Sequence, residues 1–361
     1  MARRPERLQM TSMTRYQRVG LGLVIGLLVL TALGGIVRVT GSGLACPDWP
    51  ACYGSVFPTG DFGEFAAYQV WLEWTHRLVA AIMGLIILGY AIATWRRLPD
   101  RPQVWWPAVA AIPLLAVQVV LGGLTVTERL EDVIVTLHLA TAMLILAAVA
   151  VSWLGTFDWR VVTSEDEAPL GSNAPSQART FARVVLFTAI LVYAVVVVGS
   201  YVTHVGAGPD SGAHVGPGGA ACGNQWPLCY GGLWPDGEYA QWNMSHRLLV
   251  LVGGLAIFGA AMGVVMMRPR SRPLTLLLHG AATLYLAQVF IGAAMIWINF
   301  DNWARALHLS MGSIVWLLTA AAALVAAYRA GWLGADRRAS ATVQPMSAVA
   351  SGNAAESEGE G

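Results

Sequence analysis

The strongest constraint on this chain is a series of apolar runs, each long enough to cross a lipid bilayer. An α-helix rises about 1.5 Å per residue, so about 20 residues span the hydrocarbon core. Because lipid offers the backbone no hydrogen-bonding partner, each run is expected to form a helix. The predicted helices are residues 19–39, 70–95, 104–125, 133–154, 183–203, 242–267, 274–298 and 303–328.

Composition agrees with this prediction. Only 12% of the 361 residues are charged, about half the fraction found in an average soluble domain. The net charge of +1 gives no reason to expect a nucleic-acid partner. The first run resembles a signal peptide, but it ends in Val37–Gly41 and not in a small-residue cleavage site, so we retain it as a helix. The chain is predicted to be an all-α integral membrane protein with eight transmembrane helices.

Arginine placement predicts the orientation of these helices. Arginines gather near both ends of the chain and in alternate connections, whereas the other connections are acidic or neutral. Because positive residues are enriched on the cytoplasmic side, we expect both termini to be cytoplasmic in a multi-pass plasma-membrane protein. The arginines concerned are Arg3, Arg4, Arg7, Arg15, Arg18, Arg96, Arg97, Arg101, Arg268, Arg270, Arg272, Arg329, Arg337 and Arg338.

The chain also contains an internal duplication. Three motifs recur 170 residues later, as His76 recurs in His246. Each repeat holds four predicted helices, so both halves have the same orientation, and we expect two tandem four-helix bundles related by a pseudo-twofold axis along the membrane normal. The predicted units are a cytoplasmic tail at 1–18, a first half at 19–154, a flexible cytoplasmic linker at 155–181, a second half at 182–328 and a disordered cytoplasmic tail at 329–361.

Four histidines lie about two turns inside the outer ends of the even-numbered helices. They are His76 and His138 in the first half and His246 and His308 in the second, with the same spacing in both pairs. An ionisable group within a membrane helix is a functional candidate, and two facing imidazoles in a bundle can ligate a heme iron. The alternative is hydrogen bonding between helices. Zinc is a poorer candidate because the pairs lack carboxylate or cysteine ligands nearby.

Three arginines lie where a heme propionate would need a cation. Arg77 and Arg247 directly follow two of the histidines, and Arg38 ends the first helix. A guanidinium pairs well with a carboxylate. The alternative for all three is that they extend to the lipid headgroups.

Four cysteines occur in two equivalent loops on the predicted outer side. The short spacings and the oxidising compartment favour two disulfides, Cys46–Cys52 and Cys222–Cys229, over four unpaired thiols. Cys-x-x-Cys-His does not occur, so covalent heme attachment is not expected.

Together these motifs resemble the heme A synthase family. The resemblance is carried by the run Gly34–Gly54, by Glu73-x-x-His76-Arg77, by the paired cysteines and by the four histidines, and it covers about residues 19–328. It implies oxidation of the C8 methyl of heme O to the formyl of heme A, with heme b bound in one half and the substrate heme in the other. It also implies a heme O synthase (farnesyltransferase), a terminal-oxidase assembly pathway and membrane lipid as partners, with an unknown electron donor.

One difference between the halves suggests which of them is catalytic. Glu73 lies one helical turn before His76, whereas Asn243 occupies the equivalent position before His246. A carboxylate can move a proton or stabilise positive charge, and an amide cannot act as a base. We therefore expect substrate heme at His76 and His138, heme b at His246 and His308, and Glu73 as the catalytic residue. The alternative for Glu73 is a loop carboxylate on the wet rim.

The expected reaction is two successive hydroxylations that give a geminal diol, which loses water. Activation of oxygen at iron and electron removal followed by attack of water both remain open. The main rival is a diheme membrane cytochrome that passes electrons from quinol to a partner. A transporter is the third alternative, but its expected mid-membrane charges are lacking in the sequence, where Gln118 and Gln288 are the clearest polar residues within helices.

Overall fold

The computed structural model describes residues 13–157, 174–205, 220–267 and 271–333. Its eight long helices are apolar enough to cross a membrane, which confirms the predicted all-α multi-pass architecture. Most of the N-terminal tail, the middle of the predicted linker and most of the C-terminal tail lie outside the described residues. The helices are α1 (Arg15–Val39), α2 (Ala67–Arg97), α3 (Pro102–Thr127), α4 (Asp132–Gly155), α6 (Ala174–His204), α8 (Glu238–Met266), α9 (Arg272–Trp297) and α10 (Asn302–Arg329).

Most helices extend a few residues beyond the apolar runs that predicted them. The largest difference is α6, which begins at Ala174, inside the segment 155–181 that was expected to be a flexible linker. Gln177, Ala178 and Arg179 are good helix formers. Apolar length predicts only the part of a helix within the hydrocarbon, and this polar first turn continues beyond it.

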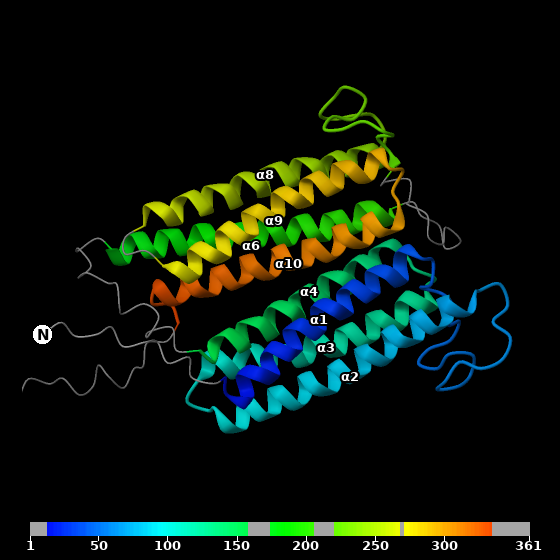
Figure 1. The fold of residues 1–361 in the computed structure, drawn as a ribbon, viewed down its shortest axis with the longest axis horizontal. Coiled ribbons are helices and arrows are strands. Elements are labelled where there is room, and N and C mark those ends of the chain that lie inside the picture. Colours follow the sequence, from blue (N-terminus) through cyan, green and yellow to red (C-terminus); the bar gives the residue numbers. More distant parts are fainter. Residues whose placement is uncertain (1–12, 158–173, 206–219, 268–270, 334–361) are drawn as a thin grey trace, which may run out of the picture.

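The eight helices form two groups of four that lie side by side (Figure 1). In the first group α2 packs on α1 and α3, and α4 also packs on α1 and α3. In the second group α8 and α10 each pack on α6 and α9. Helices α2 and α4 therefore occupy one diagonal of their bundle, and α8 and α10 occupy one diagonal of theirs.

The two groups meet along α1 and α4 of the first and α6 and α10 of the second. The indole Nε1 of Trp316 donates to the main-chain oxygen of Met143 at 2.9 Å. The hydroxyl of Tyr193 donates to the main-chain oxygen of Ala140 at 3.2 Å. The rings of Tyr193 and Trp316 also pack together, with centroids 5.2 Å apart. These contacts join the halves, while the pseudo-twofold axis itself stays a prediction.

The loops α1–α2 and α6–α8 emerge at the same end of the molecule, opposite the end where α1 begins and α10 finishes (Figure 1). Both loops contain the predicted disulfide, Cys46–Cys52 in the first and Cys222–Cys229 in the second. The turns that lead into α4 and α10 lie at this end too. Asp301 and Glu131 cap those helices by accepting hydrogen bonds from main-chain N–H groups of the first turn.

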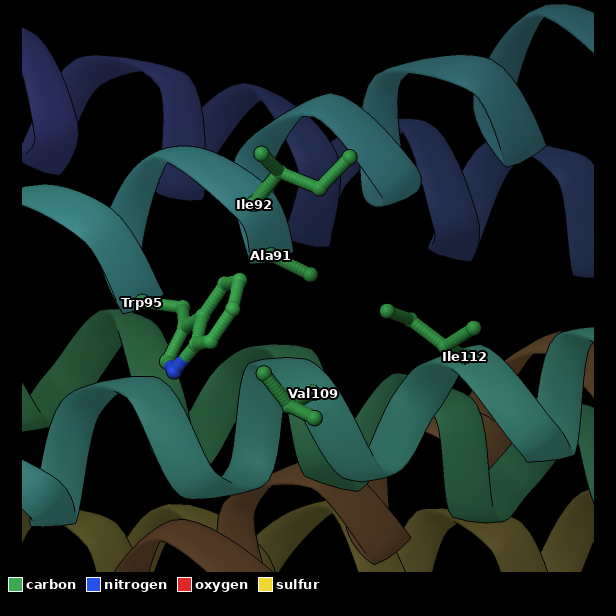
Figure 2. Close-up of a pocket in the computed structure, with 5 residues that line it drawn as sticks. All are labelled: Ala91, Ile92, Trp95, Val109 and Ile112. Carbon is green, nitrogen blue, oxygen red and sulfur yellow. The ribbon is translucent and has the colours of Figure 1, made fainter.

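An apolar hollow lies between α2 and α3 (Figure 2). It is lined by Ala91, Ile92, Trp95, Val109 and Ile112. Ala91 is 15 residues after His76 on α2, which places the hollow roughly 22 Å further along the helix axis. Its position and its apolar lining separate it from the histidines.

Candidate functional site

The four predicted histidines lie on the diagonal helices of the two bundles. His76 on α2 and His138 on α4 are close enough for their charges to interact. His246 on α8 and His308 on α10 are likewise close enough for their charges to interact. All four side chains are partly buried. Each bundle therefore brings two imidazoles near one another from helices at opposite corners, an arrangement in which two histidines could hold one heme iron.

A glycine on a neighbouring helix faces each imidazole. A Cβ on Gly34 of α1 would stand 3.0 Å from Cε1 of the first histidine, and a Cβ on Gly122 of α3 would stand 3.3 Å from Cε1 of the second. In the other half the equivalent distances are 2.6 Å at Gly199 and 2.9 Å at Gly292. The two distances in the second half are shorter than real Cβ contacts, and the two in the first half are tight. The glycines thus leave the space that the rings occupy.

The imidazoles have hydrogen-bonding capacity that the described protein does not use. Nδ1 of His76 and of His138 is buried without a hydrogen-bond partner within the described ranges, whereas the rings of His246 and His308 lie close to the main chain of Val195 and Gln288. Such buried polar atoms are uncommon and call for an explanation. No three His, Cys, Asp or Glu side chains of those ranges gather as a metal site. A porphyrin supplies four nitrogens to its iron, so two imidazoles complete the ligand set. Zinc would need further protein ligands, so the two imidazoles of each bundle suit a heme better than a zinc ion.

Glu73 is buried at the end of the first bundle that carries the disulfide loop, 4% exposed, which excludes the wet-rim alternative. Its Oε2 accepts a hydrogen bond from the main-chain N–H of Cys46 at 2.7 Å. Its Oε1 forms an ion pair with Arg77, one turn later on the same helix face. The carboxylate therefore joins α2 to the first cysteine of the disulfide loop.

Arg77 and Arg247 hold the two disulfide loops in the same way. Nη1 of Arg77 donates to the main-chain oxygens of Asp48 and Ala51, at 2.7 Å and 2.8 Å. Nη1 of Arg247 donates to the equivalent oxygens of Gln225 and Leu228, at 2.9 Å and 3.0 Å. In each loop these are the residues before the tryptophan and before the second cysteine.

These contacts differ from the predicted role of the two arginines at a propionate. Adjacent residues on a helix point about 100° apart, so Arg77 points away from the direction of His76 and toward the loop. The ion pair between Arg77 and Glu73 could have been predicted from their i, i+4 spacing. The propionate contact of Arg77 and Arg247 stays a prediction, and holding the loops is the role that the observed hydrogen bonds support.

Arg38 lies at the junction of the two bundles. A Cβ on Gly35, one turn before it on α1, would stand 2.8 Å from Cδ2 of Leu309 on α10. Arg38 is mostly buried and is close enough to Arg305 of α10 and Asp132 of α4 to experience the charges of both. The third predicted propionate ligand therefore faces both halves, and its role stays a prediction.

The loop tryptophans contact different surfaces in the two halves. Trp49 lies against Gly123 of α3, where a Cβ would stand 3.2 Å from the indole Cδ2. Gly123 directly follows Gly122, which faces His138. In the second half Ala293 takes the place of Gly123, and Trp226 packs edge-on to Trp297, with ring centroids 6.3 Å apart. The loop of the first half therefore rests on the wall of its histidine site.

Two glutamines also belong to the site. Nε2 of Gln118 lies 3.2 Å from Nε2 of His138, and Nε2 of Gln288 donates to the main-chain oxygen of His308 at 2.6 Å. From the sequence, both were recognised only as polar residues at repeated positions in apolar helices, with no link to the histidines. Their position one turn before the glycine that faces each ring is the signal that connects them to the histidines.

The chain matches known proteins over most of its length. The family described as COX15-CtaA, cytochrome oxidase assembly protein, matches residues 17–321. The chain is 29% identical over 283 residues to a protein named Heme A synthase from Shouchella clausii (strain KSM-K16), with 78% of this chain and 86% of that protein covered. Proteins of the same name from Bacillus licheniformis and Staphylococcus aureus (strain bovine RF122 / ET3-1) are 27% and 26% identical, with 67% and 78% of this chain and 74% and 86% of their own lengths covered.

Proposed function

The chain belongs to the COX15-CtaA family of cytochrome oxidase assembly proteins, and we propose that it is a heme A synthase that oxidises the C8 methyl of heme O to a formyl group. The observation that carries this proposal is the repeated pair of facing histidines, each opposite a glycine. Two such pairs suit two hemes. Relatives that carry the name Heme A synthase agree with this reading.

The first half is the proposed substrate site, with heme O held by His76 and His138. The support is the break in the repeat at Glu73, which Asn243 replaces in the second half. Glu73 is buried on the same helix as His76 and forms an ion pair with Arg77. A carboxylate held this way favours positive charge on a nearby porphyrin substituent and can accept a proton released from it.

The second half is the proposed site of heme b, held by His246 and His308. When bound, heme b supplies one-electron transfer for the oxidation. The protein's own contribution is to fix the two imidazoles on diagonal helices and to keep the halves in contact. Trp316 and Tyr193 do so by donating hydrogen bonds to α4 close to His138.

The disulfide loops are proposed to form the outer cover of the two sites. In the first half Arg77 and Glu73 fix the loop on the α2 side, and Trp49 rests on α3. A cover held at both sides excludes water from the reacting methyl. We place these loops on the outer side of the plasma membrane and both termini in the cytoplasm, on the distribution of arginines. Membrane lipid, a heme O synthase, a terminal-oxidase assembly pathway and an as yet unidentified electron donor are the proposed partners.

The test is to produce the protein together with a heme O source in a host that makes no heme A. Hemes are then extracted and separated by chromatography. Heme A or its hydroxylated precursor is the expected product. Unchanged heme O beside heme b would instead select the diheme electron-transfer cytochrome.

A further inference from the structure

Gln118 and Gln288 occupy equivalent positions in the two halves but make different hydrogen bonds. Nε2 of Gln118 reaches the ring of His138, at 3.2 Å from Nε2. Nε2 of Gln288 reaches the main chain of His308, at 2.6 Å from the carbonyl oxygen. Both halves therefore have a glutamine amide at this position, but only in the first half does the amide contact an imidazole nitrogen.

The contact with His138 shows which of its atoms is occupied. The hydrogen bond with Gln118 occupies Nε2 of His138, whichever of the two groups donates. Nε2 is also the nitrogen open to a porphyrin iron, because Nδ1 adjoins the carbon that carries Cβ. A ring nitrogen cannot make this hydrogen bond and bind iron at the same time. Gln118 and a heme therefore compete for the same atom.

The amide of Gln118 is free to leave this contact. Its Oε1 is buried and has no hydrogen-bond partner among the described residues, so rotation of the amide away from the ring breaks no second hydrogen bond. When a heme leaves, the same amide can return and satisfy the exposed imidazole nitrogen, which would otherwise be buried without a partner.

We propose that Gln118 is a positioning residue that makes heme ligation by His138 reversible. This inference rests on the proposed function, in which the heme of the first half must enter as substrate and leave as product. Heme b in the second half would have no such need, and there the side-chain amide of Gln288 is directed at the main chain of His308 and not at its ring. Gln118 thus contacts the ring in the half where the heme must exchange, and Gln288 does not contact the ring through its amide in the half where the heme stays bound.

The experiment measures heme release from each site. The full-length protein is purified, loaded with heme b in both sites and mixed with excess apomyoglobin, and transfer is followed by absorption. The wild type should release heme in two phases. Gln118→Leu should slow one phase by roughly 2- to 12-fold, the effect of removing one competing hydrogen bond, and leave the other unchanged. The matched variant Gln288→Leu should slow neither.

Gln118→Met, which also lacks a donor and is close in volume, provides a second measurement should the leucine variant yield little protein. Unchanged or faster release in both Gln118 variants would overturn the proposal, as would equal slowing in Gln288→Leu. Because heme b is the probe, the readout does not require heme A to form. A protein that makes no heme A but shows the phase-specific slowing would contradict the proposed activity and support this inference.

Discussion

The carboxylate of Glu73 accepts a hydrogen bond from the main-chain N–H of Cys46 at 2.7 Å. This contact joins the helix that bears His76 to the first cysteine of the disulfide loop. The same carboxylate pairs with Arg77, which donates to the main-chain oxygen of Cys46 at 2.9 Å. The residue that distinguishes the two halves in sequence therefore also helps Arg77 to hold the disulfide loop of the first half.

Glu73→Gln separates these two roles. Glutamine keeps an acceptor oxygen for the N–H of Cys46 but loses the carboxylate. We expect heme A formation to fall by about 100-fold, the scale of a lost acid–base group, while both hemes are retained. The measurement is chromatography of extracted hemes together with the heme content of the purified variant.

Glu64→Gln is the matched control, because Glu64 is an exposed carboxylate in the same connection. It should leave the yield of heme A unchanged. Normal heme A formation by Glu73→Gln would show that the carboxylate is not required and would remove the reason for placing the substrate in the first half.

Arg77→Leu and Arg247→Leu compare the two loop contacts. Both variants lose donors to equivalent loop carbonyls. Only Arg77→Leu also leaves a buried carboxylate without its ion pair, which typically destabilises a protein by about 3 kcal/mol or more. We expect the larger loss of thermal stability in Arg77→Leu, measured by the unfolding temperature of both purified variants in one detergent. Equal losses would mean that the pair with Glu73 contributes little.

The helices and the histidine pairs were predictable because each depends on a simple property of the chain. Apolar length determines which segments cross the membrane, and the repeat offset places His76 and His246 in equivalent positions. The disulfides were predictable from spacing and compartment. In each case one local pattern carried the information.

The loop contacts were not predicted because they depend on direction and on long-range packing. Arg77 was assigned to a propionate since it adjoins His76 in sequence, yet neighbouring helix residues point about 100° apart. The start of α6 at Ala174 was missed because polar residues continue a helix beyond the membrane. The different contacts of Gln118 and Gln288 arise from small packing differences between similar sequences.

Gly199→Ala tests whether the glycines clear the imidazole sites. The new Cβ would stand 2.6 Å from Cε1 of His246, so the ring must move from its position opposite His308. We expect loss of heme from the second half, measured by the heme-to-protein ratio and the low-spin absorption spectrum. Gly259→Ala is the control on α8, where a Cβ would meet nothing within 4 Å. It should keep both hemes and stabilise its helix by about 0.5–1 kcal/mol. Full heme content in Gly199→Ala would show that the site tolerates a shifted ring.

Gly123→Ala and Ala293→Gly exchange the small residues that distinguish the loop contacts of the two halves. In Gly123→Ala the added Cβ would stand 3.2 Å from Cδ2 of Trp49, so the indole must move by a few tenths of an ångström away from α3. We expect faster amide hydrogen exchange at residues 47–54, because the packing on that side of the loop is loosened while Arg77 still holds the other side. Ala293→Gly removes a Cβ without touching Trp49 and should leave exchange at 47–54 unchanged. If both variants kept the wild-type exchange rates, the loop would be held by Arg77 and Glu73 alone, and Trp49 would have no part in covering the site.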